Sequence, residues 1–206
     1  MNTLQKRMKM ALGFPMILAL AGCEAEIPVS EPVPADAAFE EGELAIPVMG
    51  EEIDILAFGD SLFAAHNLTK PEGYPRRLEV ALRSRGINAQ VFDSGVSGDT
   101  TSAGLDRLEF VLNAQDEAPD LFILELGGND LLRAIQPEET RANFEAMLTI
   151  LSERDIPVLL MGMRAPTNYG PEYEAQYDAL YSELAAEYDA SLIPFWLEDI
   201  LSLIHI

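Results

Sequence analysis

The chain has 206 residues, of which 49% are hydrophobic and 8% aromatic, so it is long enough for one folded domain with a sizeable core. Its 35 Asp and Glu residues against 13 Lys and Arg residues give a formal net charge of −22, which disfavours nucleic acids and other polyanions as partners. Such acidity is typical of a solvated surface and identifies no substrate. Because Cys23 is the only cysteine, no disulfide can form within one chain.

The first 22 residues have the pattern of an export signal. Three basic residues and no acidic ones precede an apolar stretch over residues 10–21, which is too short to span a bilayer. The segment Leu20-Ala21-Gly22-Cys23 resembles the lipobox of bacterial lipoproteins. The resemblance implies cleavage before Cys23 and lipidation of its thiol, and the alternative is that Cys23 is an ordinary apolar residue of a signal helix. We therefore expect an exported protein, anchored by lipid in the outer membrane and facing the periplasm.

Two further segments are expected to lie outside the folded domain. Residues 23–50 are rich in Pro, Glu and Ala without a sustained apolar period, which predicts a tether. Residues 201–206 form an apolar hexapeptide that resembles the translation of a transposon end used in preparing sequencing libraries, so we interpret it as a non-native tail. The folded domain is then expected over residues 51–200, incomplete at its C-terminal end.

After the tether, apolar runs alternate with helical patterns. Strands are predicted at Ile53–Phe58, Ala89–Phe92, Leu121–Leu126, Val158–Met163 and Ser191–Phe195, and helices at Tyr74–Arg85, Thr101–Asn113, from Pro137 onward, and at Glu172–Tyr188. Strands that are apolar throughout and separated by helices indicate a parallel sheet covered on both faces. The predicted fold is a three-layer α/β/α sandwich with a flavodoxin-like sheet, and one more helix is expected after the last strand.

Three polar segments follow three of these apolar runs. They are Gly59-Asp60-Ser61-Leu62, Ser97-Gly98-Asp99-Thr100 and Gly127-Gly128-Asn129-Asp130. Because the carboxyl ends of parallel strands meet at one edge of a sheet, these segments could bring an attacking oxygen and two hydrogen-bond donors into one crevice. Phe63 stands where the nucleophile elbow Gly-x-Ser-x-Gly requires glycine, which argues against an α/β-hydrolase.

In this order and spacing the three segments resemble the SGNH, or GDSL, hydrolase superfamily, specifically its bacterial arylesterases and periplasmic thioesterase/lysophospholipases. The resemblance implies that Ser61 is the nucleophile and that its own N–H is one oxyanion donor. It implies that Gly98 gives a second N–H, with no side chain to obstruct the substrate carbonyl, and that the Asn129 amide gives the third. It also places four residues in or beside the substrate groove: Asp60, Arg164, Asn168 and Tyr169. No metal or other cofactor is implied.

The proton acceptor is the missing part. The superfamily has an Asp-x-x-His pair late in the chain, whereas this sequence has only His66 and His205. His66 follows Ser61 by five residues and is expected to point away from it into solvent. His205 lies in the hexapeptide, six positions after Asp199 instead of three. We therefore expect the pair to follow Ile200 in the parent gene, and the chain as given to be poorly active.

The predicted function is serine-dependent hydrolysis of acyl esters or thioesters through an acyl-enzyme. The substrate could be a short aryl ester, an acyl thioester, a lysophospholipid or an acetylated sugar, because fold and triad do not determine the acyl or alcohol group. The alternative is a non-catalytic, surface-anchored binding domain that keeps the fold without a general base. A flavodoxin-like ligand binder is disfavoured, since no phosphate-cradling glycine loop follows the first strand. The oligomeric state is not predicted.

Overall fold

The computed structural model describes residues 47–199. The predicted signal, the lipidation site Cys23, most of the tether, His205 and the hexapeptide 201–206 lie outside the described residues and stay predictions. Of the helix expected after the last strand, the structure describes only Glu198 and Asp199, which are helical.

Five parallel strands form one sheet in the order β2-β1-β3-β4-β5. The sheet comprises β1 (Ile53–Gly59), β2 (Ala89–Gly95), β3 (Leu121–Glu125), β4 (Val158–Met161) and β5 (Ser191–Ile193). The central strand β1 pairs with β2 from Ile53 opposite Ala89 to Gly59 opposite Gly95, and it pairs with β3 on its other side. From Ile55 to Phe58 this strand is buried on both faces, which explains why these four residues are all apolar.

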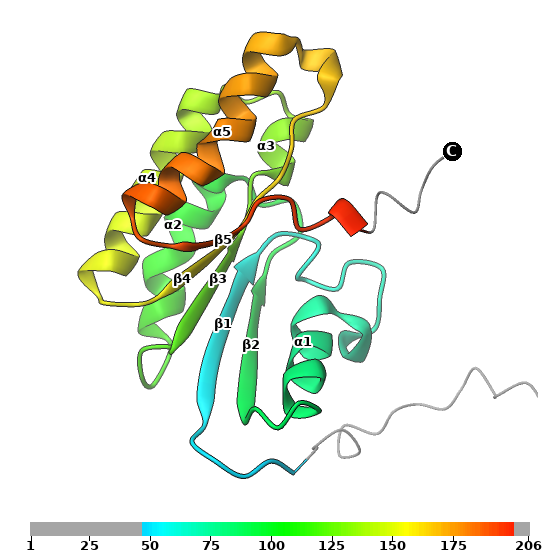
Figure 1. Ribbon diagram of the computed structural model, residues 1–206, viewed down its shortest axis with the longest axis vertical. Helices are drawn as coiled ribbons and strands as arrows, with labels where there is room; N and C mark the ends of the chain where they lie inside the picture. The colour runs from blue at the N-terminus through cyan, green and yellow to red at the C-terminus, as the bar shows by residue number, and fades with distance from the viewer. Residues whose placement is uncertain (1–46, 200–206) are drawn as a thin grey trace, which may run out of the picture. The chain divides into compact units, whose positions relative to one another are not determined.

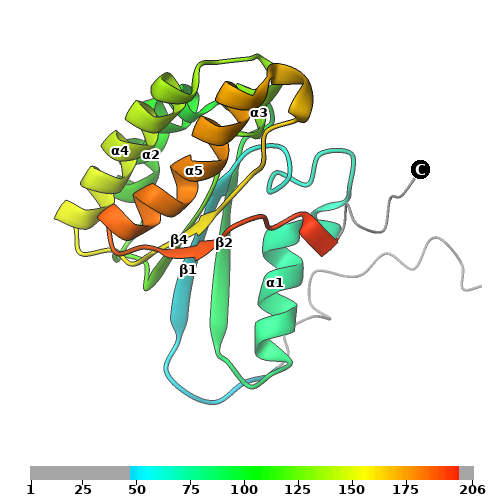
Figure 2. The same cartoon turned by 45° about the horizontal axis from the view of Figure 1, so that its top comes forward.

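The helices cover the two faces of the sheet unequally (Figures 1 and 2). Three long helices lie side by side on one face, and one helix lies on the other. The structure contains α1 (Tyr74–Arg83), α2 (Thr101–Asn113), α3 (Gly128–Leu132), α4 (Pro137–Glu153) and α5 (Pro171–Glu187), with short 3-10 turns at Lys70–Glu72 and Thr167–Tyr169. Helices α2, α4 and α5 form the three-helix layer, and α1 forms the other. The predicted three-layer sandwich with a flavodoxin-like strand order is confirmed.

Alternating residues of the strands supply two separate cores. Leu56 and Phe58 face the layer of α2, α4 and α5, together with side chains from β3, α4 and α5. Ile55 and Ala57 face α1 in a smaller cluster that includes Phe63. Since burial of one large apolar side chain contributes roughly 1.5–3 kcal/mol, the three-helix layer holds most of the apolar stabilisation.

Several element ends differ from the sequence prediction, each for a local reason. Strand β2 continues to Gly95 instead of Phe92, because it pairs along the whole length of β1. Helix α1 ends at Arg83, and α3, a helix of five residues, was not predicted. Helices α4 and α5 both begin with proline followed by glutamate, as the sequence indicates for α4. Within residues 47–199, no helix is long and apolar enough to cross a membrane.

Two phenylalanines of the three-helix layer, one buried and one exposed, test the assignment of the core. Phe144 of α4 is 0% exposed and packs edge-on against Tyr181, whereas Phe110 of α2 is 77% exposed. Phe144→Ala is expected to lower the free energy of unfolding by about 3–5 kcal/mol through cavity formation, and Phe110→Ala should change it by less than about 0.5 kcal/mol. Urea denaturation measures both. Equal costs would contradict the assignment of the core.

Candidate active site

The three polar segments meet at the carboxyl edge of the sheet. Ser61 follows β1, the loop of residues 96–100 follows β2, and residues 126–129 follow β3. Because β1 lies between β2 and β3, the Ser61 turn is flanked by the other two segments. The crevice outside the carboxyl ends of strands, where the strand order reverses, is the usual ligand site of such sheets.

A tight turn presents Ser61 beside this edge. The backbone N–H of Ala64 donates to Asp60 O at 3.0 Å, and that of His66 donates to Ser61 O at 3.3 Å. The Ser61 side chain is half-buried, and its hydroxyl lies 3.5 Å from Asp60 Oδ1, a long contact that leaves Oγ available. Among the residues that the structure describes, the Ser61 N–H has no hydrogen-bond partner.

Gly98 presents a second N–H without a partner in the described part of the chain. Its φ of +89° lies in the left-handed region, and its carbonyl accepts a 2.8 Å hydrogen bond from Arg133 Nη2. A Cβ at this position would meet only Arg133 Nη2, at 3.8 Å. This backbone conformation is by itself a reason for glycine, and the expected close approach of a substrate carbonyl stays a prediction.

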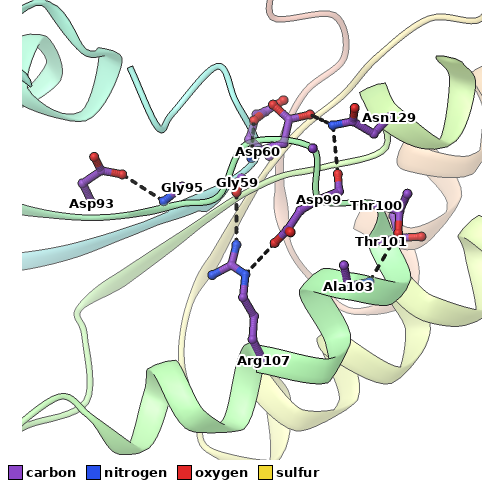
Figure 3. A network of polar contacts seen from close by, with 12 residues as sticks. Gly59, Asp60, Asp93, Gly95, Asp99, Thr100, Thr101, Ala103, Arg107 and Asn129 are labelled. Carbon is purple, nitrogen blue, oxygen red and sulfur yellow. Dashed lines mark hydrogen bonds and ion pairs between the residues drawn. The ribbon is translucent and has the colours of Figure 1, made fainter. Parts of the chain in front are cut away.

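The Asn129 amide ties the three segments together (Figure 3). Its Nδ2 donates to Asp60 Oδ2 at 2.9 Å and to the backbone carbonyl of Asp99 at 2.9 Å. An amide nitrogen has two hydrogens, so both are engaged in this state. To donate to an oxyanion as well, Asn129 must share or exchange one of these bonds.

Arg107 of α2 reinforces the same network and was not identified from the sequence (Figure 3). Its Nε donates to Asp99 Oδ2 at 2.6 Å, and Nη2 donates to Gly59 O at 3.1 Å. The guanidinium carbon also lies 3.8 Å from the centre of the Phe58 ring. One charge-assisted contact and one bond to a strand end thus fix the loop after β2 against β1.

Side chains of α3, and of Arg133 directly after it, hold the loop of residues 96–100, here called the oxyanion loop, and the start of α2. Asn129 donates to Asp99 O, and Arg133 donates to Gly98 O at 2.8 Å. Between them, the buried Asp130 carboxylate accepts from the backbone N–H of Thr101 at 2.9 Å and from the Thr101 hydroxyl. The loop between β2 and α2 therefore takes its shape from α3.

A ladder of four tyrosines anchors α3 in turn. Tyrosines at every fourth position donate their hydroxyls to four backbone carbonyls of segment 126–135: Tyr169 to Leu131, Tyr173 to Ile135, Tyr177 to Gly127 and Tyr181 to Leu126, at 2.7–2.9 Å. Burial raises the pKa values of the Tyr177 and Tyr181 hydroxyls, so both remain protonated donors. The four-residue spacing is visible in the sequence and was overlooked.

Comparisons with known proteins identify the family of the chain. The model of the GDSL-like Lipase/Acylhydrolase family matches residues 57–202. The chain belongs to this family. Esterase TesA of Pseudomonas aeruginosa is 36% identical over 146 residues, which cover 71% of this chain and 72% of the relative. Thioesterase 1/protease 1/lysophospholipase L1 of Escherichia coli K12 is 35% identical over 146 residues, 71% of this chain and 68% of that protein.

Solved structures of family members show the same fold. The crystal structure of AlinE4, an SGNH-hydrolase family esterase, is 56% identical with a TM-score of 0.73 and covers 76% of this chain and 85% of that one. The crystal structure of TesA is 35% identical with a TM-score of 0.66, covering 71% and 81%. The superfamily expected from the three polar segments is therefore confirmed.

The residues that the family resemblance assigned to the groove lie in different surroundings. Asp60 is only 2% exposed and accepts from Leu62 N at 3.0 Å as well as from Asn129, so it shapes the turn beneath Ser61. Arg164 is exposed, 3.8 Å from Glu198 and over the Phe195 ring. Asn168 is exposed in the turn Thr167–Tyr169, and the Tyr169 hydroxyl is taken by α3. No contact joins Arg164 or Asn168 to Ser61, so their groove assignment stays a prediction.

His66, the one histidine in residues 47–199, does not contact the Ser61 hydroxyl. It is exposed, and its Nδ1 lies 3.5 Å from Ser97 Oγ. In the same described range, no group of three His, Cys, Asp or Glu side chains is arranged to hold a metal ion.

Gly127 offers a test of the anchoring of α3. Its φ is +99°, and a Cβ there would lie 2.3 Å from the Tyr181 hydroxyl and 2.5 Å from that of Tyr177. Gly86 has a φ of +86° with open space around it. Gly86→Ala should therefore cost about 1–2 kcal/mol from its backbone alone. Gly127→Ala should cost clearly more, because it also displaces two buried hydrogen bonds. Thermal unfolding compares them, and equal losses would refute the steric role of the tyrosines.

Proposed function

We propose that this protein hydrolyses acyl esters or thioesters through a covalent acyl-enzyme on Ser61. One observation carries the proposal: the edge of the sheet holds the Ser61 hydroxyl, the Asn129 amide, and the N–H groups of Ser61 and Gly98, which have no partner within residues 47–199. Family membership supports it, as do relatives named esterase, arylesterase and thioesterase. The protein is thus a carboxylic ester hydrolase with small ester substrates.

Each group of the site has a part in the proposed reaction. Ser61 Oγ attacks the carbonyl carbon, its proton passes to a general base, and the carbonyl oxygen becomes an oxyanion. The N–H groups of Ser61 and Gly98 donate to that oxyanion, and Asn129 adds a third donor by sharing one of its two bonds. The alcohol or thiol leaves with the proton, and water then releases the acid by the same steps.

Fixed donors make the non-catalytic alternative less favourable. The N–H groups of Ser61 and Gly98, beside a half-buried serine, can stabilise developing negative charge. A non-catalytic binding domain has no requirement for such donors. The names of relatives include an arylesterase and a thioesterase/lysophospholipase, so aryl esters, thioesters and lysophospholipids are the substrates that we propose to test.

For the general base we propose the Asp-x-x-His pair that the superfamily places after its last strand. The position of His66 supports this, because its imidazole is exposed beside Ser97 and away from the Ser61 hydroxyl. His66 is then a surface residue with no role in the proton transfer.

Hydrolysis of p-nitrophenyl esters tests the proposal on two proteins: the 206-residue chain, and a fusion in which the C-terminal segment of a relative, with its Asp-x-x-His pair, follows Ile200. The fusion should be much more active, since without a base only about 10³–10⁴ of rate enhancement over water is expected. In the fusion, Ser61→Ala should abolish turnover, and Asn129→Ala should lower kcat by about 10²–10³.

His66→Ala is the matched control and should retain most of the activity of the fusion. Full activity of Ser61→Ala would rule out the nucleophile. If the 206-residue chain already matched the fusion, and His66→Ala or His205→Ala abolished that activity, the histidine concerned would be the base and the proposal of a later pair would be wrong.

A further inference from the structure

Glu125 is a buried carboxyl group for which the reaction described above has no use. It is the last residue of β3 and is 0% exposed. Its Oε2 accepts a 3.2 Å hydrogen bond from the backbone N–H of Asp60, and its Oε1 is buried without a hydrogen-bond partner among the described residues. A buried polar atom in this condition is costly, and most costly when it carries charge.

Both oxygens of the neighbouring Asp60 carboxylate accept hydrogen bonds from N–H groups, and the Ser61 hydroxyl lies 3.5 Å from Oδ1. Oδ1 accepts from Leu62 N at 3.0 Å, and Oδ2 accepts from Asn129 Nδ2 at 2.9 Å. An N–H donor cannot accept a proton in return, so Asp60 is best served as the ionised member of the pair. Any proton retained by the two carboxyls therefore belongs on Glu125.

Within the described part of the chain, no cation interacts with Glu125 to stabilise a second negative charge. The titratable groups that interact with it electrostatically are Asp60, Tyr74 from α1 and Tyr181 from α5. Arg107, the guanidinium that approaches this strand end, is already engaged by Asp99 and Gly59 O. Two adjacent buried carboxylates without a cation would repel each other strongly.

We infer that Glu125 is a positioning residue that remains a neutral carboxylic acid and holds Asp60 as the single buried anion that orients Asn129 and the Ser61 turn. Glycine at position 59 leaves room for the Glu125 carboxyl, since a Cβ on Gly59 would lie 2.7 Å from Glu125 Oε2. Ionisation of Glu125 would place a second negative charge beside Asp60. Repulsion between the two carboxylates would then weaken the hydrogen bond between Asp60 and the Asn129 amide.

Electrostatics support the assignment made from the geometry. Burial, and then the Asp60 charge, raise the pKa of Glu125 well above its usual value. Burial also raises the pKa of Asp60, but its hydrogen bonds with Leu62, Glu125, Ser61 and Asn129 oppose that shift. Asp60 therefore loses its proton at a lower pH than Glu125.

The first test is the infrared carbonyl band of a protonated carboxylic acid, recorded on the full chain near neutral pH. The band should be present in the wild type, absent in Glu125→Gln, and unchanged in Glu187→Gln, a control that removes a carboxyl from an exposed position. Loss of the band in Glu187→Gln, or its absence from the wild type, would overturn the inference.

The pH dependence of unfolding gives a second readout. Unfolded Glu125 titrates near its ordinary pKa of about 4.3, whereas the folded group keeps its proton to higher pH, so unfolding releases a proton above that value. The wild-type free energy of unfolding should thus fall as pH rises from about 5 toward the raised pKa. Glu125→Gln should lack about one proton's worth of that slope, and Glu187→Gln should retain it. Identical slopes in all three proteins would refute the proposal.

A pair of isosteric variants separates positioning from simple burial. Glu125→Gln keeps an oxygen that accepts from the Asp60 N–H. Asp60→Asn keeps only one accepting oxygen, so its NH₂ must face either Leu62 N–H or Asn129 Nδ2, and both of these are donors. Asp60→Asn should therefore be the more destabilising of the two. Equal destabilisation would contradict the assignment of the proton to Glu125.

The role of Glu125 in catalysis rests on the proposed ester hydrolysis, but the infrared band and the unfolding measurements do not. In the active fusion, Glu125→Gln should change the pH at which kcat falls on the alkaline side of its pH profile, while KM stays unchanged. If the alkaline side of the profile did not move, the positioning role would be contradicted. Absence of hydrolysis with the band and slope present would refute the proposed function alone. Hydrolysis with neither band nor slope would refute the role of Glu125 alone.

Discussion

The site depends on one side-chain amide, that of Asn129, held between the Asp60 carboxylate and the Asp99 carbonyl. These two bonds join segments that follow three different strands, so the position of each segment fixes the others. In a region largely excluded from water, such bonds strengthen one another, and the loss of one leaves a buried polar group unpaired. This is why the nucleophile turn and the oxyanion loop need no ligand to be brought together.

Further contacts around Asn129 stabilise the same arrangement. Arg107 ties Asp99 to the end of β1, and Tyr177 and Tyr181 of α5 fix the backbone just before Asn129. The donors that would face an oxyanion are neutral dipoles, and this suits a chain of net charge −22 because they require no local excess of cations. Donors of this kind stabilise developing charge without reorganising during the reaction.

The sequence predicted what depends on local pattern. Apolar runs such as Ile53–Phe58 and Val158–Met163 identified the strands, and the order of Ser61, Gly98 and Asn129 identified the family. It did not predict contacts that require the third dimension. Arg107 lies eight residues beyond its partner Asp99, and nothing in one sequence distinguishes it from any other helical arginine. The left-handed φ of Gly98 likewise belongs to a loop whose contacts, such as that with Arg133, join segments distant in the sequence.

A crystal structure of the active fusion after reaction with a phosphonate ester inhibitor tests the central claim most directly, because the tetrahedral adduct stands in for the oxyanion intermediate. The account predicts phosphorus on Ser61 Oγ, with one phosphonyl oxygen accepting from the N–H groups of Ser61 and Gly98 and from Asn129 Nδ2, while Asn129 keeps its bond to Asp60. An adduct on another residue, or a phosphonyl oxygen turned away from Gly98 and Asn129, would contradict it.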